Sequence, residues 1–138
     1  TYTKTKKIFA ALSELEKKEE INAGQLMTSK LVSTSPSASV KEAIGKMKKH
    51  EISQLPVIDS NKLVGLVSES TILDALLKSK SKIVREVMQE APPIVSKTTS
   101  IQVVSNLLKH YPIVVVSEEG RLVGLITKSD LLGKLYKS

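Results

Sequence analysis

The stretch Gly124-Leu-Ile-Thr-Lys-Ser-Asp130 carries most of the information in this chain, and Gly65-Leu-Val-Ser-Glu-Ser-Thr71 repeats its pattern. Each stretch overlaps a short apolar run that is typical of a strand, over Leu122–Ile126 and Leu63–Val67 respectively. Each then leads into a pattern with helical spacing. A hydroxyl residue therefore stands twice where a strand passes into a helix, with a polar residue three positions later.

The second junction has two interpretations. Thr127 can cap the helix predicted over Leu131–Leu135, with Asp130 in the first turn facing the positive end of the helix dipole. Alternatively, the helix start is a phosphate site at which Thr127 donates its hydroxyl and Asp130 accepts from sugar hydroxyls. Capping boxes are common, but a second copy, before a helix predicted over Ile72–Leu77, lies inside a longer repeat and favours the ligand interpretation.

The composition is that of an ordinary soluble globular protein. The chain has 138 residues, of which 41% are hydrophobic and 25% charged, enough for one compact unit or two small halves that support each other. No apolar run approaches the length of a membrane span and no signal peptide opens the chain, so we expect no membrane association. The absence of cysteine excludes disulfides and thiolate chemistry and suits a cytoplasmic location.

The net charge of +7 allows a nucleic-acid partner, an anionic small molecule or simply a soluble surface. The lysines are scattered over predicted helix faces instead of forming a basic block, and aromatic residues make up only 3%, which leaves few platforms for base stacking. His50 and His110 lie at Lys-rich helix ends without the spacing of metal ligands. No nucleophile–base pair or carboxylate pair is evident, so we predict neither a metal site nor catalytic residues, and no enzyme activity.

The longer repeat matches Leu26–Val40 to Val87–Ile101. Each copy is predicted to hold a short strand, a polar turn and a serine, Ser39 or Ser100, that caps the next helix. Those helices are expected over Val40–His50 and Ile101–His110.

A pair of strands follows each predicted helix. The pairs are Gln54–Ile58 with Leu63–Val67, and Pro112–Val116 with Leu122–Ile126, and the short polar segments between them have hairpin chemistry. The first strand of each pair is almost continuously apolar, as expected of a strand covered on both faces. The sequence therefore predicts an α/β fold of two β-α-β-β-α repeats, neither of which can cover its own sheet alone.

The N-terminal region is predicted to be a separate helix over Thr5–Glu20, with Ile8, Leu12 and Leu15 on one face. So short an amphipathic helix needs a surface to pack against, either this protein, a second copy or a preceding domain. Asn22-Ala-Gly24 is then expected to act as a hinge. We therefore predict an N-terminal helix or linker over 1–20, a first repeat over 21–80 and a second repeat over 81–138.

The order of Pro56-Val-Ile-Asp59, Leu63-Val-Gly65 and Thr127-Lys-Ser-Asp130 resembles that of a tandem pair of CBS domains, a Bateman module, from Ile21 to Ser138. The resemblance implies two repeats packed about a pseudo-twofold axis, two clefts for adenosine ligands, and further assembly into a homodimer. More weakly, Tyr2–Leu12 resembles the last helix of the repressor-type helix-turn-helix that precedes a CBS pair in some archaeal regulators. That likeness implies a missing N-terminal DNA-binding domain.

The resemblance places the ligand in the cleft around Asp130. An ionised carboxylate can accept both ribose hydroxyls, while Thr127 and Ser129 can donate to phosphate beside the free amides of the helix start. The expected ligand is AMP, ADP, ATP or a compound like S-adenosylmethionine, with no cofactor required. The remaining predicted site residues form two walls, a mouth and a basic edge: Ile52, Ser53 and Gln54; Leu125, Tyr111 and Pro112; Ser29, Lys30 and Leu31; and Lys128. Lys30 and Lys128 together favour an anion.

Several of these residues also have simpler interpretations. Ile52 and Leu125 can be core residues, Pro112 can mark the start of a strand, and Tyr111 can be a half-buried ring at a strand edge.

Two departures from the family pattern shape the expectations. Thr71 stands where an aspartate is expected, so the cleft around Ser68 and Thr71 is predicted to be weak or empty, with one ligand per chain. The segment before the second strand pair is also shorter than its counterpart, and the usual Leu-Pro-Val is replaced there by Ile-Val-Val. The leading hypothesis is a regulatory module that senses an adenosyl ligand. The alternatives are nucleic-acid binding and a purely dimerising module.

Overall fold

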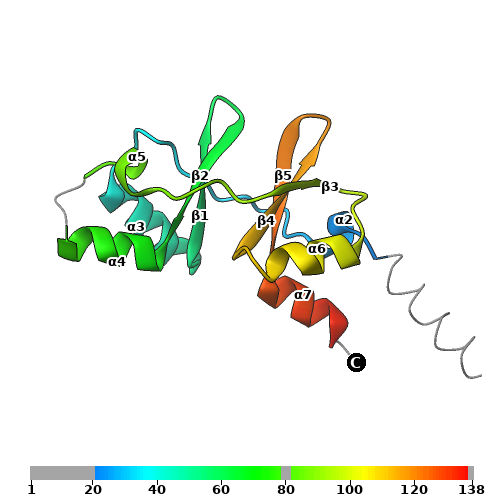
Figure 1. Cartoon of the computed structure of the whole chain (residues 1–138). Helices are drawn as coiled ribbons and strands as arrows, with labels where there is room; N and C mark the ends of the chain where they lie inside the picture. Colours follow the sequence, from blue (N-terminus) through cyan, green and yellow to red (C-terminus); the bar gives the residue numbers. More distant parts are fainter. Residues whose placement is uncertain (1–20, 79–81, 137–138) are drawn as a thin grey trace, which may run out of the picture.

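The computed structural model describes residues 21–78 and 82–136, which form two similar α/β halves side by side (Figure 1). The predicted N-terminal helix lies outside the described residues. The first half holds α2 (Ala23–Leu26), α3 (Val40–His50), β1 (Gln54–Asp59), β2 (Lys62–Ser68) and α4 (Glu69–Lys78). The second holds α5 (Val84–Val87), β3 (Ile94–Ser96), α6 (Ile101–Leu108), β4 (Ile113–Glu118), β5 (Arg121–Thr127) and α7 (Lys128–Leu135).

The two long helices begin where the sequence predicts, because a serine caps each. Ser39 accepts a hydrogen bond from the backbone of Glu42 at 3.0 Å, and Ser100 accepts one from Val103 at 3.4 Å. Helix α3 has the predicted bounds, whereas α6 ends at Leu108, two residues before the predicted end.

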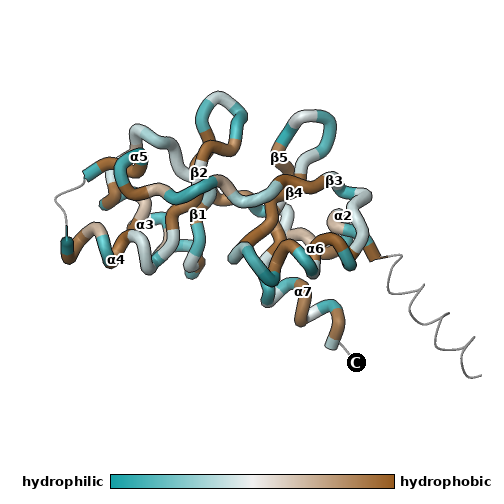
Figure 2. Tube along the Cα trace, in the orientation of Figure 1, coloured by the Kyte–Doolittle hydropathy of each residue, from teal (hydrophilic) through white to brown (hydrophobic). Residues whose placement is uncertain are grey.

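Both predicted hairpins are confirmed. β1 pairs antiparallel with β2, and β4 with β5, while β3 adds a parallel strand to the second sheet. The tips have positive φ at Ser60 and Asn61 (49° and 66°) and at Glu119 and Gly120 (50° and 78°). Two successive left-handed residues match the right-handed twist of the strands and fix the register of each pair. In Figure 2 the tips are hydrophilic and the strands below them hydrophobic.

Three local predictions are wrong. Asn22-Ala-Gly24 is not a hinge, because the side chain of Asn22 caps α2 and Gln25 bonds back to its backbone. The short strand predicted after Leu26 is reduced to one parallel bridge between Thr34 and Val57, and only the second half forms a strand there, β3. Finally, α4 and α7 begin at Glu69 and Lys128, directly after their strands, and not at Ile72 and Leu131.

The two hydrophobic cores exchange short helices. Ala23 and Leu26 of α2 are buried with Val95, Val104 and residues of β4 and β5, in the core of the second half. Val84 of α5 is buried with β1, β2 and α3, in the core of the first half. The second half therefore completes its core with α2, which begins the first half in the sequence. The first half completes its core with α5, which begins the second half, and this exchange ties the two halves together.

Two glycines make the exchange possible. A Cβ on Gly124 would lie 2.7 Å from the carbonyl oxygen of Thr28, and one on Gly65 would lie 2.9 Å from that of Gln89. The crossing segments pass this close because they form bridges with the strands, Thr28 with Leu125 and Gln89 with Leu66. The glycines are thus needed for close approach of another backbone.

Between the halves, the buried residues Leu66, Ile113 and Val115 form a third cluster, with Leu63 and Leu122 against it. Strands from both repeats thus cover each other, as predicted for sheets that neither half can seal alone.

Candidate functional site

A cavity of about 440 Å³ opens where β5 passes into α7; we name it the Asp130 pocket. Three segments contribute to it: the crossing segment after α2, the end of α3 with the start of β1, and the second strand pair with the start of α7. Its lining residues are Thr28, Lys30, Val32, Glu51, Ile52, Ser53, Gln54, Pro112, Ile113, Leu125, Thr127, Lys128, Ser129 and Asp130.

The Asp130 carboxylate has different partners on its two oxygens. Oδ2 accepts hydrogen bonds from the backbone N–H of Thr127 at 2.9 Å and from its hydroxyl at 3.1 Å, and the backbone N–H of Asp130 donates to that hydroxyl at 3.2 Å. This is a capping box, so the capping interpretation of the junction is correct. Among the described residues, Oδ1 accepts one hydrogen bond, from the Thr28 hydroxyl at a long 3.3 Å. The cap therefore uses one oxygen and leaves acceptor capacity on the other.

Most of the predicted site residues line this pocket, and the exceptions have a geometric reason. Thr28, Lys30 and Val32 line it, whereas Ser29 and Leu31 do not. In an extended segment, alternate side chains point to opposite sides, so only every second residue can face a cavity. The same alternation, applied to the sequence, would have identified Thr28 and Val32.

Strand register locates the second wall. Gln54 pairs with Ser68 and Ile113 pairs with Thr127, so Gln54 and Ile113 hold equivalent positions in the two repeats. The counterparts of Leu55-Pro-Val57 are therefore Val114-Val-Val116, and the predicted match to Ile-Val-Val is wrong by one residue. Tyr111 precedes the strand, is 37% exposed and does not line the pocket.

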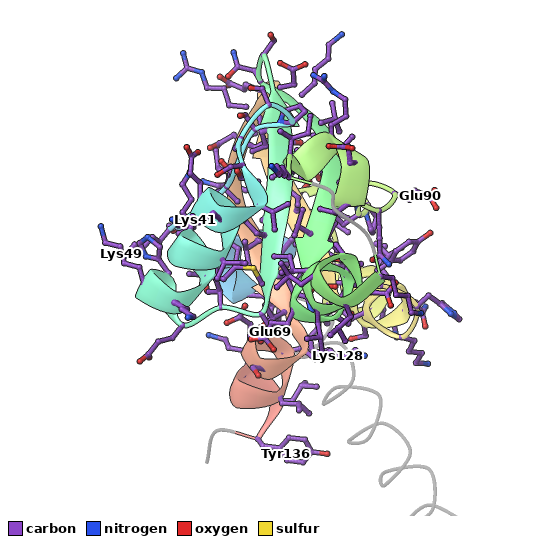
Figure 3. All side chains as sticks on the ribbon, turned by 90° about the vertical axis from the view of Figure 1, so that its left-hand side faces the viewer. Lys41, Lys49, Glu69, Glu90, Lys128 and Tyr136 are labelled. Carbon is purple, nitrogen blue, oxygen red and sulfur yellow. The ribbon has the colours of Figure 1, made fainter. Side chains whose placement is uncertain are left out.

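The pocket holds charges of both signs: Lys30, Lys128, Glu51 and Asp130. Both lysines are exposed. In Figure 3, Lys128 and Glu69 lie at the end of the strands opposite the hairpin tips. Desolvation, together with the positive charges of Lys30, Lys49 and Lys46, lowers the pKa of His50, at the end of α3, below its usual value.

The junction in the first half differs. The Thr71 hydroxyl accepts from the backbone N–H of Ser68 at 2.9 Å and donates to the Ser68 carbonyl at 2.9 Å, and Ser68 itself is buried. Thr71 lines a cavity of about 300 Å³ with the acidic residues Asp74 and Glu86, while Ser68 does not. These two hydroxyls are thus engaged in their own helix start, and no carboxylate takes the place that Asp130 has in the second half.

A second, more apolar hollow of about 730 Å³ lies between α3 and α4; we name it the α3–α4 groove. Leu73 and Leu76 line it and are 59% and 60% exposed. Glu51, Ile52 and Ser53 line both this groove and the Asp130 pocket, so one short segment forms a shared wall. The Ser53 carbonyl also accepts the backbone N–H of Glu69 at 3.1 Å, which joins this wall to the first residue of α4.

Comparison with known proteins identifies the family. The CBS domain family model matches residues 23–78 and 84–137, one match for each repeat. The chain belongs to the CBS domain family. Its two CBS domains occur in tandem, as a Bateman module.

Relatives of this CBS pair include two enzymes and a structure with a bound nucleotide. The inosine-5'-monophosphate dehydrogenase of Korarchaeum cryptofilum is 36% identical over 104 residues, covering 73% of this chain and 21% of that protein. A zinc metalloprotease of Methanocaldococcus jannaschii is 33% identical over 114 residues, covering 83% of this chain and 32% of that protein. The chain thus spans less than a third of these relatives. The structure of CBSX2 in complex with AMP, a CBS-pair protein of Arabidopsis thaliana, has a TM-score of 0.72 and 27% identity, over 84% of this chain and 96% of that one.

Residues 21–78 and 82–136 also bear on metal binding and on membrane crossing. Within them, His, Asp and Glu do not gather in any group that could hold a metal ion. No helix there has the length and hydropathy needed to cross a bilayer.

Proposed function

We propose that this CBS pair is a regulatory module that binds one adenosine nucleotide or adenosyl compound per chain in the Asp130 pocket. The observation that carries the proposal is the position of Asp130: one carboxylate oxygen is held in the cap, the other accepts a single long hydrogen bond, and the residue borders a cavity of about 440 Å³. A cap alone needs no cavity in front of it.

The chemistry of the lining suits a nucleoside phosphate. Oδ1 of Asp130 accepts the ribose hydroxyls, because an ionised carboxylate is a stronger acceptor than a hydroxyl. The hydroxyl of Ser129 donates to the phosphate beside the unpaired amides at the start of α7, and the hydroxyl of Thr127 does so when its hydrogen turns from Oδ2 of Asp130 to the ligand. Lys30 and Lys128 add positive charge at the edge, and the apolar wall receives the base. The complex of the related CBSX2 with AMP supports the choice of ligand class.

We propose a regulatory role and no catalysis by these residues. The enzymes related to this chain match it over a fifth to a third of their length. Asp130 has Thr127 and Thr28 as partners, neither of which is a base or an acid for it. The domain that this module controls, including a DNA-binding domain before residue 1, stays a prediction.

The output surface is the α3–α4 groove, covered by a second copy of this chain. The exposed leucines of α4 have counterparts on α7, where Leu132 and Leu135 are also exposed. Two equivalent helices in one chain suit a twofold, self-complementary contact. The segment Glu51–Ser53 borders both hollows, so its position affects how α4 packs. A ligand that binds one position of this segment more tightly shifts the equilibrium between two packings of α4, and the difference between its two affinities sets the size of that shift.

Isothermal titration calorimetry with AMP, ADP, ATP and S-adenosylmethionine tests the proposal. We expect one site per chain, and a loss of affinity of at least about tenfold in Asp130→Asn, which keeps the size of the side chain and removes its charge. Asp74→Asn is the matched control, because Asp74 lies in the other half and pairs with Lys78 at the surface. Wild-type protein that binds none of the four compounds, or Asp130→Asn binding as tightly as wild type, would refute the site.

The net charge of +7 supports one other candidate, direct binding of nucleic acid. That function predicts an affinity that falls steeply with salt and does not change in Asp130→Asn. A fluorescence anisotropy titration of a DNA duplex at two salt concentrations separates the two functions.

A further inference from the structure

We propose that the Asp130 pocket prefers ADP or ATP to AMP, because a basic cluster beside it binds the second and third phosphates. The cluster consists of Lys30, Lys46, Lys49 and His50. The inference rests on the proposed function and narrows its ligand class to an adenosine polyphosphate.

The cluster joins the pocket to the end of α3. Lys30 lines the pocket and is exposed. Lys46 lies on α3, and its Nζ donates to the carbonyl oxygen of Ser33 at 2.7 Å, which holds the helix against the crossing segment that carries Lys30. Lys49 follows in the next turn of α3. Desolvation lowers the pKa of His50, and so do the charges of these three lysines, so the four groups lie close together.

The positive charge of the cluster lacks a counter-ion in the part of the chain that the structure describes. Two ion pairs occur there, one within α4 and one between Lys97 and Glu118, and neither includes a residue of the cluster. Glu51 also lines the pocket, but it is exposed and forms no ion pair with these described lysines. Like charges held close together repel each other, and a bound polyanion turns that repulsion into attraction.

The second repeat shows that the fold does not require this charge. The equivalent helix there, α6 (Ile101–Leu108), has no basic residue. The first-half cavity that Thr71 lines contains the carboxylates of Asp74 and Glu86 with a single lysine. The helix dipole favours positive charge in the last turn of α3, but it does not account for Lys30, which comes from another element. The basic residues therefore gather beside the pocket that holds Asp130.

The cluster lies where a longer phosphate chain can reach it. The first phosphate is proposed to lie at the start of α7, with Lys30 and Lys128 at the edge of the pocket. AMP ends at that phosphate, whereas ADP and ATP carry further phosphates past Lys30 toward the end of α3. An ammonium group has three donors and Lys46 uses one of them on Ser33, so two remain for phosphate oxygens. Hydrogen bonds between two charged groups are the stronger kind.

Calorimetry with AMP and ATP, in a magnesium-free buffer of low ionic strength, tests the inference. For wild type we expect ATP to bind at least about tenfold more tightly than AMP, because several exposed cations each add a modest attraction. The double variant Lys46→Gln/Lys49→Gln should keep its affinity for AMP and lower the ATP-to-AMP ratio to below about threefold.

The matched control is Lys41→Gln/Lys109→Gln, which changes the net charge by the same amount. Lys41 lies about two turns before Lys49 on α3, and Lys109 follows α6 in the other half. Both lysines are exposed. This variant should keep the wild-type ratio.

The pKa of His50 gives a second measurement at the cluster itself. Its ring faces Lys30, Lys46 and Lys49, and a polyphosphate bound among them favours the imidazolium. NMR titration should therefore show that ATP raises the pKa of His50 more than AMP does. An equal effect of the two nucleotides would contradict the position of the further phosphates.

The outcomes separate the inference from the proposed function. Equal affinity of wild type for AMP and ATP, or a ratio that Lys46→Gln/Lys49→Gln does not change, overturns the role of the cluster and leaves the nucleotide site intact. An equal loss in the control overturns it too, because the effect then reflects net charge alone. Wild type that binds only S-adenosylmethionine has the same meaning, whereas no binding of any adenosyl compound refutes the proposed function itself. If the double variant does not fold, Lys49→Gln alone decides, since Lys49 has no hydrogen bond or ion pair among the described residues.

Discussion

Gly124 offers a sharp test of how the fold builds the pocket. A Cβ at this position would lie 2.7 Å from the backbone oxygen of Thr28 and 2.8 Å from Sδ of Met27. The methionine side chain can move, but the oxygen belongs to a backbone held by two hydrogen bonds, Thr28 N–H to Leu125 O at 2.9 Å and Leu125 N–H to Thr28 O at 3.2 Å. Gly124→Ala must therefore push the crossing segment away from β5. Overpacking costs about 1–3 kcal/mol, and weakening the hydrogen bond to the Thr28 oxygen costs about 1 kcal/mol more, so we expect a loss of about 2–4 kcal/mol.

For a domain of this size, that loss lowers the melting temperature by roughly 6–16 °C. Gly65→Ala should destabilise by a similar amount, because its Cβ would meet the backbone oxygen of Gln89 at 2.9 Å. Gly133→Ala is the control: nothing lies within 4 Å of its Cβ, and alanine favours the helix by about 0.5–1 kcal/mol.

The two destabilised variants should differ in ligand binding. Only Gly124→Ala displaces Thr28, whose hydroxyl contacts Asp130, so only this variant should lose affinity for AMP when both are measured by calorimetry at a temperature where they are folded. Gly124→Ala as stable as wild type, or an equal loss of affinity in both variants, would refute this account of the crossing segments.

Three further predictions concern charge, stoichiometry and assembly. Lys30→Gln should raise the pKa of His50, because removal of a nearby positive charge favours the imidazolium. NMR titration of His50 measures this change, and an unchanged pKa would contradict the placement of Lys30. Calorimetry should give one adenosyl ligand per chain, and two equal sites would contradict the weak first-half cleft that Thr71 predicts. Leu76→Glu in the α3–α4 groove should reduce the mass measured by sedimentation from that of a dimer to that of a monomer, while Val103→Glu, exposed on α6, should leave it unchanged. A wild-type protein that sediments as a monomer refutes the interface.

The parts of the fold that the sequence predicts are those with strong local signals. A capping serine precedes α3 and α6, and turn residues at the hairpin tips fix the pairing of β1 with β2 and of β4 with β5. The exchange of short helices has no such signal. α2 and α5 have four residues each, too few to show helical periodicity, and their destination depends on contacts with distant strands.

The candidate site follows the same division. Thr127 and Asp130 are found from their spacing, and the wall Ile52–Gln54 from family resemblance. Glu51 was missed because it follows the last helical residue of α3 in a left-handed conformation, φ 53°, which nothing in its residue type indicates. Ile113 was missed because a shorter connection shifts the second wall by one residue relative to the first.

The most direct test of the central claim is a crystal structure of the protein grown with a mixed pool of AMP, ATP and S-adenosylmethionine. The account predicts density in the Asp130 pocket for one adenosyl compound per chain, with its ribose hydroxyls at about 2.5–3.0 Å from the Asp130 carboxylate. A pocket that stays free of nucleotide at saturating concentration, or a nucleotide bound elsewhere with Asp130 engaged only in its cap, would contradict it.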